Sequence, residues 1–178
     1  MSTVDIFNTL TAGGALVILI FLVLLVVAWL TENPIAAWTA EHAGTILRII
    51  FAGAVIGSLV YSNYFDYTPC LMCWYERICI YPVAILLFTD SIRKSALLQR
   101  QVLLLSSAGF LLALYHNFIT VFPNVSDAVC ETSGVSCQTR YVYQFGFVSI
   151  PMMSAIVLLS GILITVLVMR YPHKEIAK

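Results

Sequence analysis

Charged residues are scarce in this sequence, and their scarcity excludes most classes of soluble protein. Lys, Arg, Asp and Glu make up 10% of the 178 residues, whereas a soluble globular domain has about a quarter. Hydrophobic residues make up 61%. Because a water-facing surface cannot be built from this composition, we expect an integral membrane protein. The nine basic and nine acidic residues give zero net charge, which argues against nucleic acid as a partner.

The sequence also lacks tandem repeats and low-complexity tracts, so we expect one membrane domain over residues 1–178. Five apolar segments approach the roughly 20 residues that a bilayer-crossing helix needs. They run over Thr11–Leu30, Ile46–Tyr64, Tyr75–Thr89, Gln101–Val121 and Val148–Met169. The predicted fold class is therefore an all-α integral membrane protein.

The few basic residues gather on one side of the predicted spans. That side receives residues 31–45, 90–100 and 170–178, and the positive-inside rule makes it cytoplasmic. Its basic residues are Arg48, Arg93, Lys94, Arg100, Arg170, Lys174 and Lys178. The other side holds only Arg77 and Arg140. We therefore expect the N-terminus, the Cys70–Cys73 turn and the loop 122–147 to face outward from a cell membrane.

The five cysteines are sorted by this topology. Cys70, Cys73, Cys130 and Cys137 fall in the two outward loops, whereas Cys79 falls within the third span and is expected to be a small buried hydrophobe. Outside the cytoplasm disulfides persist, so the two pairs are structural bridges or a redox relay. A bridge across two residues constrains little chain, and a CxxC spacing is more often redox-active or metal-binding. The four together also offer enough ligands for a closed metal site.

Two polar residues lie at the membrane edge near the CxxC pair. Arg77 is one helical turn after Cys73, where it would favour a thiolate and donate to the carbonyl oxygen of an electron acceptor. Alternatively, it pairs with Glu76 and only fixes the depth of the helix. His116 lies at a similar depth in the fourth span, either as a donor and proton carrier or as a core histidine bonded to a neighbouring helix.

Four segments occur in an order that resembles a known family. They read "CWYER", "LYHNF", "CETSGVSC" and "QFGFVSIPMMS". This pattern is similar to that of DsbB, the disulfide bond formation protein B, and more closely to its BdbC-type branch of quinone-coupled thiol oxidases. The resemblance covers residues 45–170 and implies a four-helix transmembrane bundle. Residues 11–30 depart from the family pattern and would form one additional N-terminal transmembrane helix.

The resemblance also implies a role for each outward cysteine. Cys130 would exchange disulfides with an extracytoplasmic thioredoxin-like oxidase of the DsbA type, and Cys137 would be its bridging mate. Electrons would then pass to Cys70, and Cys73 would face a membrane quinone, either ubiquinone or menaquinone. The implied activity is that of a membrane thiol oxidase, a quinone-dependent protein disulfide oxidoreductase that supports disulfide formation in exported proteins.

The remaining implied positions are Arg77 and His116, which match family residues next to the quinone; no metal is implied. Two other functions stay open at this point. A vitamin K epoxide reductase-like quinone reductase is also a small bundle with a CxxC and a loop pair, but there the quinone-side CxxC normally follows the loop pair. A metal-holding membrane protein without enzyme activity is the second alternative.

Overall fold

The structure, a computed structural model, describes residues 2–122 and 135–171. Its elements in chain order are α1 (Thr3–Leu30), α2 (Pro34–Asn63), α3 (Leu71–Thr89), α4 (Ala96–Val121), β1 (Tyr143–Gln144), β2 (Val148–Ser149) and α5 (Ile150–Arg170). The five helices are all long and apolar enough to cross a membrane. The expected all-α membrane fold, with one N-terminal helix added to four others, is confirmed.

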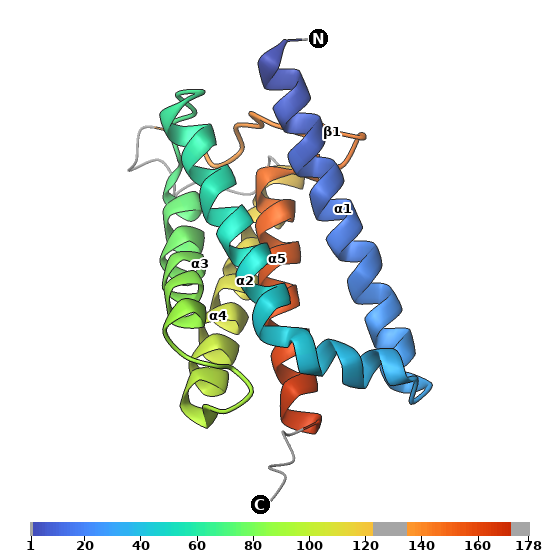
Figure 1. The fold of residues 1–178 in the computed structure, drawn as a ribbon. Coiled ribbons are helices and arrows are strands. Elements are labelled where there is room, and N and C mark those ends of the chain that lie inside the picture. The colour runs from blue at the N-terminus through green and yellow to red at the C-terminus, as the bar shows by residue number, and fades with distance from the viewer. Residues whose placement is uncertain (1, 123–134, 172–178) are drawn as a thin grey trace, which may run out of the picture.

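α5 lies at the centre of the helices and contacts each of the other four. Figure 1 shows α2, α3 and α4 grouped on one side of it and α1 leaning along the other side. Fully buried side chains from α2, α3, α4 and α5 fill the space between them; the largest include Phe51, Leu47, Leu87, Val102, Leu158 and Ile164. α1 is covered on one face only, and its Val17, Ile20 and Leu24 side chains are exposed. Exposed apolar side chains on a spanning helix face lipid.

Polar caps start the helices earlier than the apolar segments alone indicate. The side-chain oxygens of Ser2 and Ser95 each accept a backbone N–H from the first turn that follows. Such a bond satisfies one of the N–H groups that a helix start leaves without an intrahelical partner. α1 therefore begins at Thr3 and α4 at Ala96, both before the predicted starts of these spans.

The segment 31–45, predicted as a connection, is mostly helix, and the prediction was wrong there. Asn33 caps the Ile35 N–H and Pro34 occupies the first turn, which favours a helix start at this point. Ala36 and Ala40 are buried on one face of this stretch. Figure 1 shows the first part of α2 lying across the lower end of the bundle before the helix turns up into it.

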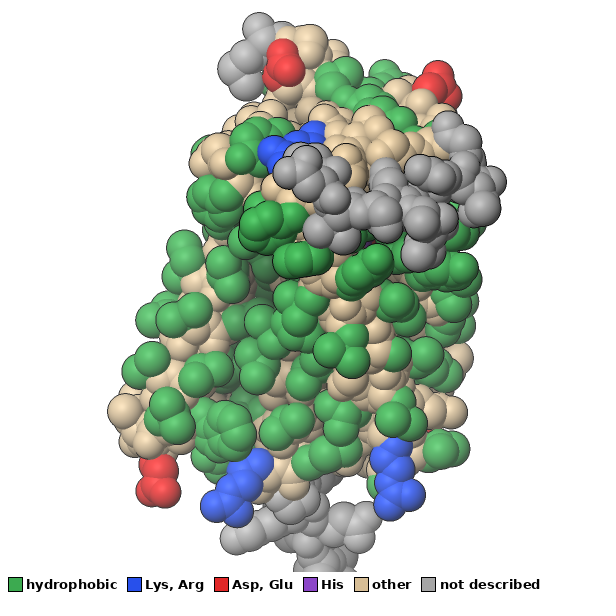
Figure 2. Space-filling model, turned by 180° about the vertical axis from the view of Figure 1, so that it is seen from behind, with side chains coloured by type: hydrophobic (Ala, Val, Ile, Leu, Met, Phe, Trp, Pro, Cys, Tyr) green, Lys and Arg blue, Asp and Glu red, His purple; other side chains and the backbone are tan. Residues whose placement is uncertain are grey.

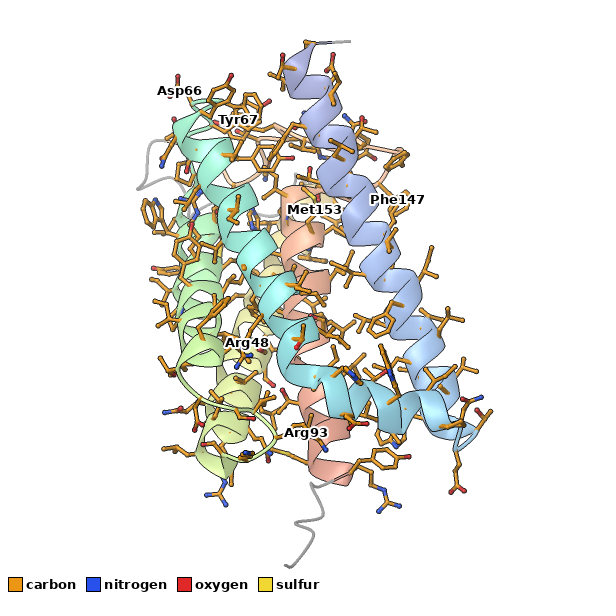
Figure 3. The ribbon with its side chains drawn as sticks, viewed as in Figure 1. Arg48, Asp66, Tyr67, Arg93, Phe147 and Met153 are labelled. Carbon is orange, nitrogen blue, oxygen red and sulfur yellow. The ribbon has the colours of Figure 1, made fainter. Side chains whose placement is uncertain are left out.

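The two segments that carry the described loop cysteines lie at the same end of the molecule as the N-terminus (Figure 1). Basic residues concentrate toward the other end, where Figure 3 labels Arg48 and Arg93; Figure 2 shows Lys and Arg side chains at this end and also a basic group near the opposite end. Lys94, Arg100 and Arg170 belong to the same end through their places at the α3–α4 connection, the start of α4 and the end of α5. Lys174 and Lys178 lie outside the described residues.

Candidate active site

Cys70 and Cys73 stand at the start of α3. Cys70 is the N-cap, and its Sγ accepts the Cys73 backbone N–H at 3.3 Å. The two sulfurs are 2.9 Å apart and both thiols are free. Cys70 is buried, whereas Cys73 is partly exposed. A sulfur at a helix N-terminus is held beside unpaired N–H donors and the positive end of the helix dipole, which favours its thiolate.

The charge on this pair is favoured at Cys70. The side chain of Cys73, which donates to the Cys70 sulfur, and then the His116 ring lower the pKa of Cys70 to about 4, although burial opposes this shift. The resemblance implies that Cys73 meets the quinone, as a thiolate or a transient adduct, and this role stays a prediction.

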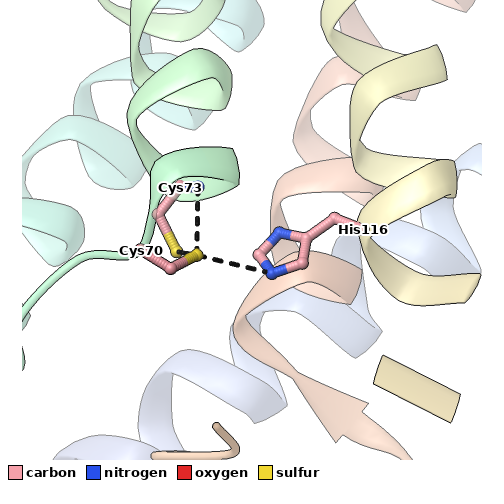
Figure 4. A group of neighbouring side chains, drawn as sticks. All are labelled: Cys70, Cys73 and His116. Carbon is pink, nitrogen blue, oxygen red and sulfur yellow. Dashed lines mark hydrogen bonds between the residues drawn. The ribbon is translucent and has the colours of Figure 1, made fainter. Parts of the chain in front are cut away.

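His116 on α4 joins three groups of the site (Figure 4). Its Nδ1 lies 2.7 Å from Oε1 of Glu76, and its Nε2 lies 3.3 Å from the Cys137 carbonyl oxygen and 3.7 Å from Sγ of Cys70. The ring is 2% exposed. A carboxylate and a carbonyl only accept, so a ring that donates to both carries a proton on each nitrogen. His116 is thus placed to donate to the Cys70 thiolate.

Glu76 is a site residue that the sequence analysis did not identify, since it was considered only as a partner for Arg77. It is 2% exposed, and within the described residues its ion-pair partner is His116. The available signal was its spacing, because a residue three positions after Cys73 lies near the same helix face. A carboxylate in the membrane region is costly unless it is paired, which makes the Glu76–His116 pair a candidate functional pair.

Arg77 points away from Glu76, toward α2. Its guanidinium donates to the Ser58 carbonyl at 3.1 Å and lies 5.3 Å from the centre of the Trp74 ring. Successive residues on a helix project about 100° apart, so Glu76 can face α4 while Arg77 faces α2. Arg77 and Cys73 both line the same large cavity.

The cavity has a volume of about 380 Å³ and lies between α1, α2, α3 and α5. A volume of this order is typical of small-molecule sites. Figure 3 labels Tyr67 and Met153 on its wall. Its polar lining includes Cys73, Glu76, Arg77 and Ser58; its apolar lining includes Ile18, Ile49, Ile50, Ala54, Ile80 and Val157. The arrangement is an apolar chamber with a thiol and a guanidinium on one wall.

Cys137 approaches the same pair from the other direction. It is buried, is disulfide-bonded, and packs in one apolar cluster with Cys70, Met72 and Ile119. Cys130 lies outside the described residues. The free dithiol therefore lies between Cys137 on one side and the cavity on the other, with Cys70 nearer the first and Cys73 lining the second.

Cys70, Cys73 and His116 hold their ligand atoms within 4.8 Å of one another, which makes them candidate metal ligands. Tetrahedral zinc with Zn–S bonds of 2.3 Å separates two sulfurs by about 3.8 Å. The observed separation of 2.9 Å is much shorter, so the pair has the geometry of a dithiol that is close to bond formation.

Cys79 is free and lies buried beside Gly109. The prediction that it is a small buried hydrophobe is confirmed.

Comparison with known proteins supplies the family. The family model described as "Disulfide bond formation protein DsbB" matches residues 40–169, so α1 lies outside the match. A "Probable disulfide formation protein" of Oceanobacillus iheyensis is 36% identical over 136 residues, which is 73% of this chain and 92% of that protein. "Disulfide bond formation protein C" of Bacillus subtilis is 30% identical over 115 residues, covering 65% of this chain and 81% of the relative.

A third relative, the "SPbeta prophage-derived disulfide bond formation protein B" of Bacillus subtilis, is 37% identical over 101 residues, covering 57% of this chain and 68% of that protein. No solved structure was found to match the chain. The family match covers well over half of the chain and includes Cys70, Cys73, Glu76, Arg77, His116 and Cys137. The protein is a multi-pass membrane oxidoreductase of disulfide formation, and the chain belongs to the DsbB family.

Proposed function

We propose that this protein is a thiol oxidase that takes electrons from an extracytoplasmic thioredoxin-like dithiol protein of the DsbA type and passes them to a membrane quinone. The observation that carries the proposal is the position of the free dithiol. Cys70 packs against disulfide-bonded Cys137, and Cys73 lines the apolar cavity. A pair with these two neighbours can exchange with a second disulfide and also meet an oxidant dissolved in the bilayer.

Two exchanges bring electrons to this pair. In the first, the partner's dithiol becomes a disulfide and the Cys130–Cys137 disulfide becomes two thiols. In the second, those thiols close again and the Cys70–Cys73 disulfide opens. Each exchange breaks one S–S bond and forms one, through a mixed disulfide. The net result is a Cys70–Cys73 dithiol that carries two electrons and two protons from the partner.

Glu76 and His116 would transfer protons to and from this dithiol. The imidazole donates toward Cys70 and is oriented by Glu76, so a proton can move between ring and sulfur without crossing an apolar region. Because Cys70 is stabilised as a thiolate, it is a good leaving group when the loop thiols open the Cys70–Cys73 disulfide. These residues thus act on the sulfur chemistry itself.

The cavity fits a quinone by its shape and by its polar groups. A bound quinone would supply the two-electron, two-proton oxidant that a dithiol requires. Arg77 would hold a carbonyl oxygen, since a guanidinium has five N–H donors and its bond to Ser58 leaves others for a ligand. A partner with a potential of about −120 mV cannot be reoxidised by a glutathione pool, which makes a quinone pool the appropriate acceptor.

The cysteine end of the bundle faces outward in this proposal. Basic residues mark the opposite end as cytoplasmic, and the N-terminus is then extracytoplasmic because the described helices are odd in number. Residues 1–178 would work as one membrane domain, in which α1, the four-helix bundle of residues 45–170 and the loop 122–147 all contribute to the same site. The order of the cysteines along the chain, with the CxxC before the loop pair, agrees with the family match and disfavours a vitamin K epoxide reductase-like enzyme.

The experiment is quinone reduction by the purified protein, driven by a reduced thioredoxin-like partner. We expect quinol and oxidised partner in equal amounts, and no turnover in Cys73→Ser or Cys130→Ser. Cys79→Ser is the matched control, because Cys79 is buried away from both pairs. Partner oxidation without quinone reduction would refute the proposal. Stoichiometric zinc in the purified protein would favour the metal-holding alternative.

Arg77 provides a separate test on the quinone side. Arg77→Ala should raise the apparent KM for quinone about tenfold to a hundredfold, the loss expected for one charged hydrogen bond. Arg77→Lys should recover only part of this, because an ammonium does not reproduce the planar donors of a guanidinium. Disulfide exchange with the partner should stay normal in both variants. An unchanged quinone dependence in folded Arg77→Ala would show that Arg77 only anchors α3.

A further inference from the structure

α1 borders the cavity although it lies outside the residues matched by the family. Its lining residues are Thr11, Gly14, Ala15 and Ile18. Each lies three or four positions from two of the others, so the four share one helix face. Residues outside this face, such as Val17, are exposed and would meet lipid. One face of α1 is therefore a wall of the cavity.

Three glycines leave the cavity open. Gly14 of α1 and Gly53 and Gly57 of α2 all line it, and a Cβ added at any of them would meet nothing within 4 Å. Gly109 is different, because a Cβ there would fall 2.7 Å from Cys79 Cβ. The cavity glycines thus border open volume, and the space between α1 and α2 is a hollow that these small residues maintain.

Tyrosines close the outer end of the hollow, and α1 helps to hold them. Tyr61 and Tyr67 stack at 5.8 Å between ring centres, and Tyr67 and Tyr141 stack at 4.7 Å. All three line the cavity. The Thr11 hydroxyl is 2.6 Å from the Tyr61 hydroxyl, and the Phe7 ring meets Tyr61 edge-on. α1 is therefore tied to the closed end next to the cysteines.

The polar groups of the cavity lie toward this outer end, and its inner part is apolar. Arg77 and Tyr81 both reach Ser58 on α2. Gly53 lies five residues deeper along α2, about 7.5 Å at 1.5 Å per residue, and the lining around it consists of apolar side chains. A ligand with a polar ring and a long apolar tail fits such a chamber in one direction only, with the ring at Cys73 and Arg77.

We propose that α1 is the wall against which the isoprenoid tail of the quinone lies, so that this helix determines the affinity for tailed quinones. The proposal rests on the quinone as the electron acceptor proposed above. It assigns Ile18 as a tail contact, because Ile18 lines the cavity on α1 about a turn deeper than Gly14. It gives α1 a role that the four-helix bundle alone does not supply.

The experiment compares Ile18→Ala with Val17→Ala, which removes carbon from the neighbouring lipid-facing position. Binding to the full-length protein in detergent is measured through quenching of tryptophan fluorescence, with Trp74 beside Arg77 as the nearest reporter. The probes are a prenylated quinone and a quinone with the same ring and no tail. The tail of the unbound probe lies in the apolar interior of the detergent micelle, so Ile18→Ala loses mainly dispersion contacts. We therefore expect Ile18→Ala to bind the tailed probe about fivefold more weakly.

Ile18→Ala should leave the tail-free probe unaffected, and Val17→Ala should leave both probes unaffected. A prenylated quinone with a photoreactive azide on its tail should label the α1 peptide in the wild-type protein. Equal effects of Ile18→Ala on both probes, or labelling confined to α4, would overturn the role of α1 while the quinone function stands. A wild-type protein that binds neither probe and reduces no quinone would instead remove the proposed function.

Discussion

At the scale of single residues, Cys70 occupies the N-cap of α3, and this position favours its thiolate form. With its pKa lowered to about 4, the thiolate exists at every pH above that value. The rate of Cys70 alkylation by a small reagent should therefore stay nearly constant from pH 8 to pH 5 and fall only near pH 4. An ordinary thiol, with a pKa of about 8.5, would lose about tenfold per unit below pH 8. Peptide mass spectrometry after timed alkylation gives the rate.

His116→Ala is the companion variant for this measurement. It removes the ring that donates to the Cys70 sulfur, so the pKa of Cys70 should rise and the flat part of the profile should end at a higher pH. A wild-type profile that already falls between pH 8 and pH 6 would contradict a thiolate at Cys70. An unchanged profile in His116→Ala would show that the histidine does not lower the pKa of Cys70. Cys73 and the helix N-terminus would then be the causes of the lowered pKa.

Glu76 provides the second prediction at this scale. Glu76→Gln keeps the size of the side chain and an accepting oxygen but removes the charge beside the His116 ring. We expect quinone reduction to slow by about tenfold to a hundredfold, the usual effect of losing a group that orients a functional histidine, with the protein still folded. Glu41→Gln, at an exposed position of α2, is the matched control. Normal turnover in Glu76→Gln would show that the pair is only structural.

At the scale of helices, two glycines set the distance between α4 and α5. A Cβ on Gly161 would fall on Ser106 Oγ and lie 3.0 Å from the Phe51 ring, and a Cβ on Gly109 would lie 2.9 Å from a Leu158 methyl. Gly161→Ala and Gly109→Ala should each destabilise the protein by about 1–3 kcal/mol, as overpacking does. Denaturant unfolding in detergent measures this.

Gly13→Ala is the control for the glycine variants. A Cβ at Gly13 would meet nothing within 4 Å, and alanine has the better helix propensity, so this change should be neutral or slightly stabilising. If Gly13→Ala lost as much stability as Gly161→Ala, the loss would come from the helix backbone and not from the α4–α5 contact. Retained stability in Gly161→Ala would mean that the two helices can separate at no cost.

Helix existence was predictable from the sequence, whereas helix limits and helix facing were not. Runs of about 20 apolar residues identify a span by themselves, so all five were found. The first turns of α2 were missed because Thr39, Glu41 and His42 interrupt the apolar residues there, which hides an amphipathic start in a search for continuous apolar runs. Helical spacing gives the angle between Glu76 and Arg77 around α3. It does not show that Glu76 faces α4 and Arg77 faces α2.

At the scale of the whole molecule, the fold separates two environments around one dithiol. The segment around Cys137 packs over the cysteine end of the bundle, where it contacts Cys70, His116 and Thr120. The cavity lies between α1, α2, α3 and α5 and reaches the pair at Cys73. In the proposed function, thiol exchange with a soluble partner and oxidation within the bilayer would take place on opposite sides of the first turn of α3.

This arrangement requires the cysteine end of the molecule to face outward, which gives the last prediction. Lys94→Cys and Asn63→Cys place exposed thiols at opposite ends of the bundle, in the α3–α4 connection and at the end of α2. In intact cells, a membrane-impermeant maleimide should label Asn63→Cys at once and Lys94→Cys only after permeabilisation. The physical reason is the excess of Lys and Arg around the α3–α4 connection, which keeps that end cytoplasmic. After mild reduction, Cys130 should be labelled together with Asn63→Cys. Labelling of Lys94→Cys in intact cells, with Asn63→Cys and Cys130 protected, would reverse the orientation and would place the dithiol in a reducing compartment, where a disulfide-forming relay could not work.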